Sequence, residues 1–238
     1  MLLNSIWDEN LTIYTIKFNT MKENGFEYVD LGLPSGTMWA TCNVGATKPE
    51  DEGLLFQWGR VDGYKYGDIN HKFRTNAQNL EDGSKSEYIP ITSSGKTYKV
   101  NNILDLADDA AHVNMGGAWK MPTQTQYSEM FNNTTRKVET INGVKGMLFT
   151  SKINNKQLFI PFVGYWYNGS FTASGVNALV WSSQVHPHPS FVNNAYKLNC
   201  TSSGTTTIDL GGSRSFAFSV RGVFNFNEHK NNNINMLI

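Results

Sequence analysis

The sequence contains few cysteines, little charge and no long hydrophobic run. Its 238 residues include two cysteines, Cys42 and Cys200, in no Cys-x-x-Cys or Cys/His spacing typical of zinc sites. Charged residues make up 17%, and 20 basic residues balance 20 acidic ones, so the electrostatic footprint of a nucleic-acid-binding protein is missing. No apolar run approaches the ~20 residues of a membrane-spanning helix. We therefore expect two free, buried thiols, no nucleic-acid partner and no membrane insertion.

The usual signatures of catalysis are also absent. The sequence has no P-loop, no nucleophile elbow and no His-Glu-x-x-His motif. His186 and His188 could offer two imidazoles to a metal, but no third ligand is evident, so a solvent-exposed loop is the simpler interpretation. We expect a protein that is not an enzyme and that has no cofactor and no bound metal.

The two ends of the chain differ from its middle. The first residues lack the basic region and long apolar core of a signal peptide, so secretion by that route is unsupported. Residues 1–24 are expected to be an N-terminal arm or extension, in which residues 11–18 form either a strand or a docking arm, and Met21 is an alternative start. Residues 227–238 are expected to be a flexible tail. The main domain is expected at residues 25–226.

Aromatic residues and glycine are abundant. Aromatic residues make up 13% of the chain beside 21 glycines, a mixture typical of short strands and tight turns. Residues 60–100 are polar and rich in turn signals, which predicts a long surface insertion. Apolar or alternating runs predict strands at residues 28–33, 38–46, 54–59, 144–151, 157–162, 178–183, 195–199, 206–210 and 216–223, and an aromatic segment ending in a turn at residues 164–169.

Two helices are predicted in the middle of the chain. The first spans residues 103–114 and ends at Gly116, because glycine accepts the positive φ of a helix C-terminus. The second begins with a capping box formed by Thr123 and Gln126 and continues to about residue 132. The predicted order of elements is strands, two helices and then many short strands, which is typical of an α+β fold. The tryptophans in apolar sequence are expected in the core: Trp39, Trp58, Trp119 and Trp181.

Several motifs carry a resemblance to a known family. They are Tyr-Val-Asp-Leu-Gly-Leu-Pro-Ser-Gly at residues 28–36, Trp-Ala-Thr-Cys-Asn-Val-Gly-Ala at 39–46, Trp-Gly at 58–59, Gly-Gly-Ala-Trp-Lys-Met-Pro-Thr at 116–123, Trp-Ser-Ser at 181–183 and Ser-Val-Arg-Gly-Val at 219–223. In this order they resemble the Fibrobacter succinogenes major paralogous domain over residues 26–224. That family is similar to C-type lectin-like folds, including formylglycine-generating enzymes and the variable proteins of diversity-generating retroelements.

The resemblance implies an α+β, C-type lectin-like fold. Two helices would flank a small antiparallel sheet that pairs the N- and C-terminal strands, and an irregular second sheet would carry the ligand face. The family is abundant in gut Bacteroidetes and their phages, whose versions at tail-fibre tips bind host surfaces. We therefore expect a non-enzymatic module that recognises a cell-surface protein or glycan, on a phage tail or a bacterial cell surface.

Two other functions stay open. One is a structural or assembly domain of a phage tail or surface protein, in which residues 1–24 join protomers into a homo-oligomer. The other is an enzyme of the formylglycine-generating type, although its reactive cysteine pair near the C-terminal end is reduced here to Cys200.

Calcium is not expected to take part in binding. Sugar-binding C-type lectins use Glu-Pro-Asn or Gln-Pro-Asp together with Trp-Asn-Asp, whereas Trp181 is followed by Ser-Ser-Gln. Calcium needs several converging oxygens, commonly with carboxylates. Asp209 is the only carboxylate between residues 184 and 220.

Residues 185–220 have the composition of an adaptable contact surface. They are rich in Asn, Ser, Thr and Gly and contain no Glu, Gln, Met or Trp, a bias that adenine mutagenesis of Asn-type codons would leave. The alternative is that strand surfaces favour Thr, Ser and Asn in any case. Small polar side chains beside aromatic anchors are typical of variable binders. We expect these residues to form one exposed ligand-binding surface: Trp166, Tyr167, Gln184, His186, His188, Phe191, Asn193, Asn194, Tyr196, Asn199, Ser213 and Arg214. For Trp166 and Tyr167 the alternative is packing in the core.

Overall fold

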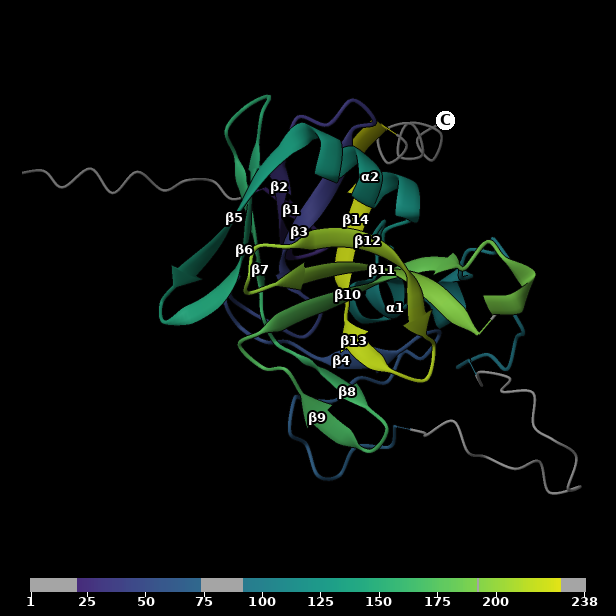
Figure 1. The fold of residues 1–238 in the computed structure, drawn as a ribbon. Helices are drawn as coiled ribbons and strands as arrows, with labels where there is room; N and C mark the ends of the chain where they lie inside the picture. The colour runs from purple at the N-terminus through teal and green to yellow at the C-terminus, as the bar shows by residue number, and fades with distance from the viewer. Residues whose placement is uncertain (1–20, 74–91, 192, 228–238) are drawn as a thin grey trace, which may run out of the picture.

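The computed structural model describes residues 21–73, 92–191 and 193–227, and Figure 1 labels its elements. Three parts of the chain lie outside the described residues: residues 1–20 of the arm expected at 1–24, residues 74–91 of the expected insertion, and residues 228–238 of the tail expected at 227–238. The helices are the 3-10 helix η1 (Leu106–Asp108), α1 (Ala110–Met115), α2 (Gln124–Asn133) and the 3-10 helix η2 (Pro189–Phe191). The strands are β1 (Lys22–Glu23), β2 (Phe26–Asp30), β3 (Thr37–Asn43), β4 (Leu55–Gln57), β5 (Thr134–Ile141), β6 (Val144–Ser151), β7 (Gln157–Pro161), β8 (Tyr165–Tyr167), β9 (Ser170–Thr172), β10 (Asn177–Val185), β11 (Asn194–Thr201), β12 (Thr206–Ser213), β13 (Ala217–Ser219) and β14 (Arg221–Asn225).

The first and last described strands belong to one sheet, of order β1-β2-β3-β14. β14 runs antiparallel to β3 and places Val223 opposite Trp39. Trp39 is fully buried and its ring lies 5.4 Å from that of Tyr127 in α2. This sheet confirms the pairing of N- and C-terminal strands that the resemblance implied.

A larger sheet has the order β12-β11-β10-β13-β8-β9, and β4 pairs with β13. Val180 of β10 belongs to a buried cluster with Tyr127 and Leu198, whereas the next residue, Trp181, belongs to a cluster with Phe56. Successive residues of a strand point to opposite faces, so β10 has an apolar core on both sides. Figure 1 shows α2 close to β12 and β14.

Helix α2 begins as the sequence predicts. The Gln126 N–H donates to the Thr123 hydroxyl at 3.3 Å, and the Thr123 N–H donates to the Gln126 side-chain oxygen at 2.9 Å, which completes the capping box. Tyr127 and Met130 then fall on the buried side of the helix. The C-cap at Gly116 is confirmed as well, with a φ of 67°.

The other predicted helix is wrong over its first half. Residues 103–109 form a bridge and a 3-10 turn, because Ile103 pairs with Gln184 of β10 and stays exposed. The Asp109 carboxylate accepts the N–H of His112 at 2.9 Å and so caps α1, which begins only at the next residue. The apolar period predicted the helix but did not reveal this cap.

A three-stranded sheet, β5–β6–β7, lies at the left of Figure 1, and the hairpin β8–β9 lies at the bottom. β5 pairs with β6 along its whole length, from Thr134 opposite Ser151 to Ile141 opposite Val144. Strand β5 was not predicted, because its charged and polar residues form no apolar alternation. The described parts of the insertion, residues 60–73 and 92–100, form turns and a single bridge.

The predicted tryptophan core is confirmed, since Trp39, Trp58, Trp119 and Trp181 are all buried. Both cysteines are free, but only Cys200 is buried and Cys42 is half-buried. The mixture of sheets with short helices is α+β, as predicted. Among the described residues, no helix has the length and apolar character needed to cross a membrane.

Arg221 of β14 is fully buried and links β14 to β3 and β7. Its guanidinium donates to the carbonyl of Ala40 and to that of Phe159, each at 3.1 Å. Burial lowers its pKa to about 10, so the side chain still carries its charge at neutral pH.

Candidate functional site

The candidate site is built on the loop of residues 186–193, which joins β10 to β11. The loop is closed by the His186 N–H, which donates to the carbonyl of Asn194 at 2.9 Å. On its other side the Arg214 N–H donates to the carbonyl of Asn193 at 2.9 Å, and Asn194 lies opposite Ser213 in the β11–β12 ladder. Main-chain bonds from two neighbouring strands therefore fix the position of this loop.

Four rings gather at the loop and form what we call the imidazole–aromatic cluster: His186, His188, Phe191 and Tyr196. The His186 ring centroid lies 5.1 Å from that of Phe191 and 6.3 Å from that of Tyr196, with which it is nearly parallel. The His188 ring lies 5.7 Å from Phe191. Phe191 is 51% exposed despite these contacts, so it offers apolar surface to solvent.

The main chain fixes the tautomer of both histidines. The His188 N–H donates to Nδ1 of His186 at 3.0 Å, and the Ser190 N–H donates to Nδ1 of His188 at 3.2 Å. A neutral imidazole that accepts at Nδ1 carries its proton on Nε2. Burial lowers the pKa of His186, which favours this neutral form. Each ring therefore presents an Nε2–H donor on the edge opposite its main-chain bond.

Tyr167 is linked to this loop by a chain of contacts through Phe216 and Ser213. Its ring is 47% exposed and lies 4.5 Å from that of Phe216. The Phe216 N–H donates to the carbonyl of Ser213 at 3.0 Å, and Ser213 lies opposite Asn194. A line of contacts thus runs from the tip of β8 to the loop.

Three of the residues expected on the surface are buried, so the expectation of exposure is wrong for them. Trp166 is 1% exposed because His71 and Phe73 pack against its ring. Arg214 is 2% exposed, and its guanidinium lies 4.8 Å above the ring of Trp58. His186 is 6% exposed, and its ring contacts those of Phe191 and Tyr196. For Trp166 the alternative of core packing is the one observed.

The remaining expected residues are exposed or half-buried. His188 is exposed, as are Phe191 and Tyr167. Gln184 pairs with Ile103 at the edge of β10, and Asn199 lies farther along β11, where its amide donates to Asp209 at 3.1 Å. The half-buried members are Gln184, Asn193, Asn194, Tyr196, Asn199 and Ser213.

An ion pair between Lys197 and Asp209 was not predicted from the sequence. Their charged atoms lie 3.4 Å apart across β11 and β12, with Lys197 nearly buried. Burial lowers the pKa of Lys197. Burial works against ionisation of Asp209 too, but hydrogen bonds and the charge of Lys197 lower its pKa overall. The signal in the sequence was that Lys197 is the single lysine of a polar stretch. Its pairing with Asp209 depends on the register of β11 and β12, which the sequence does not show.

Within the described residues, no three His, Cys, Asp or Glu side chains group closely enough to hold a metal ion. The arrangement offers hydrogen-bond donors, amides and exposed rings, which suit recognition. Comparison of the chain with protein-family models, with curated proteins and with solved structures found no match.

Proposed function

We propose that this protein is a non-enzymatic module that recognises a cell-surface protein or glycan through the loop of residues 186–193 and its neighbours. The observation that carries the proposal is the exposed ring of Phe191 on a loop held by main-chain hydrogen bonds to β11 and β12. A rigid aromatic anchor beside adaptable amides costs little conformational entropy on binding.

The remaining contacts of the proposed surface extend from this anchor. The His188 ring contacts Phe191. Asn193 and Asn194 follow Phe191 where the loop enters β11, and Tyr167 lies at the end of the contacts through Phe216. The buried Trp166 and Arg214 would support these residues from below. We propose for the whole domain a C-type lectin-like fold, which the pairing of the first and last described strands in one small antiparallel sheet supports. A calcium-independent, retroelement-diversified protein of a phage or gut bacterium is consistent with the residue bias.

The experiment replaces the three accessible rings of the cluster together. The triple variant His188→Ala, Phe191→Ala, Tyr196→Ala is expected to lose binding to a panel of gut-bacterial cells while keeping its melting temperature, because surface substitutions usually change stability little. The matched control replaces three exposed apolar residues elsewhere, Val113, Ile153 and Val176, by Ala. Normal binding by the first variant, or equal loss in both, would contradict the proposal.

A further inference from the structure

We propose that the imidazole–aromatic cluster binds the carboxylate of a sugar, so that the ligand of this surface is an acidic glycan. This inference rests on the proposed binding function and adds the chemistry of the ligand.

Within the described part of the chain, the two Nε2–H groups are donors without an acceptor. Because each Nδ1 accepts a main-chain N–H, the ring proton is on Nε2 and neither ring can turn over without losing that bond. Among the described residues, no hydrogen-bond partner faces either Nε2 atom. A ligand that satisfies both must bring acceptor oxygens, and the two oxygens of one carboxylate are suited to a pair of donors.

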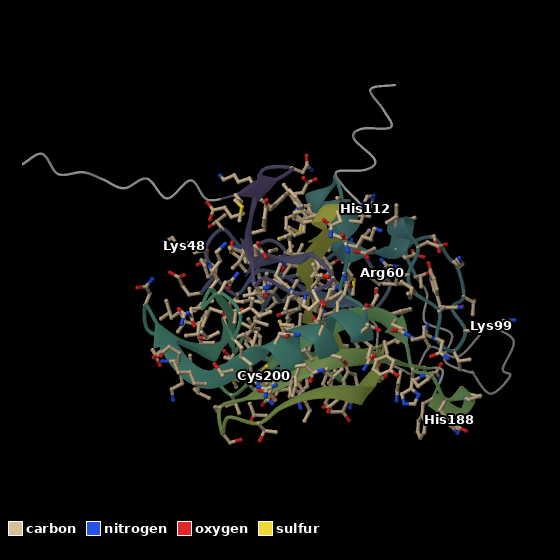
Figure 2. The ribbon with its side chains drawn as sticks, turned by 90° about the horizontal axis from the view of Figure 1, so that it is seen from above. Lys48, Arg60, Lys99, His112, His188 and Cys200 are labelled. Atoms are coloured by element: carbon tan, nitrogen blue, oxygen red, sulfur yellow. The ribbon has the colours of Figure 1, made fainter. Side chains whose placement is uncertain are left out.

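A nearby cation favours an acceptor that carries negative charge. Asn102 links Lys99 to the start of the loop: its side-chain oxygen accepts the Lys99 N–H at 2.7 Å, and its carbonyl accepts the Val185 N–H at 2.9 Å. Figure 2 shows Lys99 and His188 at the same end of the molecule. Lys99 is exposed and forms no ion pair with a described residue.

The carboxylates on the adjoining segments do not cancel this charge. Asp105 pairs with Lys96, and Asp209 pairs with Lys197. Among the residues that the structure describes, the charge of Lys99 is therefore not neutralised by an ion pair. Charge-assisted hydrogen bonds are about twice as strong as neutral ones, so an anionic ligand gains more here than an alcohol.

The Phe191 ring favours a sugar as the source of the carboxylate. Its exposed ring lies within 5.1 Å of His186 and 5.7 Å of His188. A pyranose has an apolar C–H face and carries its carboxylate at the rim, so one acidic sugar can cover the ring and reach the donors beside it. An aspartate or glutamate side chain has no such face and would leave Phe191 in water.

The ligand arm of the test uses tetrasaccharides ending in a uronic or a sialic acid. Each is compared with the same molecule after its carboxylate has been reduced to an alcohol, by isothermal titration calorimetry. We expect an acid to bind and its alcohol to bind about tenfold more weakly or worse, which is the loss that removing a charge-assisted hydrogen bond produces. A glutamate-containing tetrapeptide tests the peptide source.

The protein arm of the test removes the Nε2–H donor of His188 while keeping the conformation of the loop. In His188→Asn, the side-chain oxygen can still accept the Ser190 N–H, as asparagine does in turns, but the amide stops short of the position of Nε2. We expect the acid to bind about tenfold more weakly or worse, with an unchanged melting temperature. The control Lys48→Asn lies at the opposite end of the molecule in Figure 2 and should bind normally.

Four results would overturn the carboxylate assignment. They are equal binding of an acid and its alcohol, no binding of any acid, binding of the tetrapeptide as tight as that of the sugars, and unchanged binding by His188→Asn. None of these touches the proposed binding function, which depends on the separate loss of cell binding in the triple alanine variant.

Discussion

His188 donates its main-chain N–H to the ring of His186 at 3.0 Å, so the position of one histidine fixes the proton of the other. The bond requires a lone pair on Nδ1, which an imidazolium ion lacks. Protonation of His186 is thus opposed by its own loop as well as by burial, and the conformation of the loop depends on the neutral ring.

Folding stability is expected to fall as the pH drops below about 6.5, where histidine titrates in an unfolded chain. Burial lowers the pKa of His186 in the folded protein, so the unfolded chain takes up the proton first and the stabilisation is lost as the pH falls towards the folded pKa. Melting temperatures on either side of that pH test this in the parent protein and in His186→Asn, which keeps an acceptor for His188. If both proteins lose stability equally over this range, His186 is not responsible.

Trp119→Ala is expected to cost roughly 3–5 kcal/mol of unfolding free energy, the usual range for removing a buried tryptophan. Trp119 is fully buried, its indole N–H donates to the carbonyl of Glu23 at 2.9 Å, and its ring meets that of Phe224 edge-on at 5.0 Å. Urea unfolding measures the loss, with Tyr167→Ala as an exposed aromatic control. A soluble variant with an unchanged unfolding curve would refute this role.

Cys200 is expected to resist alkylation by iodoacetamide until the protein unfolds. Burial raises its pKa to about 12, so almost no reactive thiolate exists near neutral pH. The half-buried Cys42, whose pKa burial also raises, should react slowly in the native state. Mass spectrometry of Cys42→Ser, which leaves Cys200 as the single thiol, checks this with and without urea. Rapid native labelling of that variant would show that Cys200 is accessible.

Removal of calcium with EDTA is expected to leave both the melting temperature and cell binding unchanged. Asp209 is the single carboxylate in the binding stretch, and it already pairs with Lys197 and accepts from Asn199. The control restores calcium in excess. A large loss of stability in EDTA would indicate a site elsewhere, with the acidic residues Glu81 and Asp82, outside the described residues, examined first.

The features that the sequence predicted correctly depend on neighbours in the chain. The capping box of Thr123 and Gln126 spans three residues, and the turn at Gly116 needs only the conformational freedom of glycine. Strand β6 was predicted with its observed bounds because its apolar run is bounded by turn residues. Local signals of this kind do not require knowledge of the fold.

The errors at the candidate site come from partners that are distant in sequence. Trp166 is covered by His71 and Phe73 of the insertion, and Arg214 lies over Trp58. A polar loop predicts that His188 and Phe191 are exposed, as they are, but not which neighbours fold beneath them. The exposed positions were therefore predictable, whereas their support required the three-dimensional structure.

The pairing of β3 with β14 also determines when the protein can fold. Trp39 has no strand partner on that side until Val223 has been synthesised, so a nascent chain on the ribosome must keep β3 waiting while nearly all of the described sequence emerges. Contacts between such distant residues carry a large loop-closure entropy and slow the search for the native state. During that interval the apolar edge of β3 is exposed. A newly made chain is then most prone to aggregate and to bind chaperones.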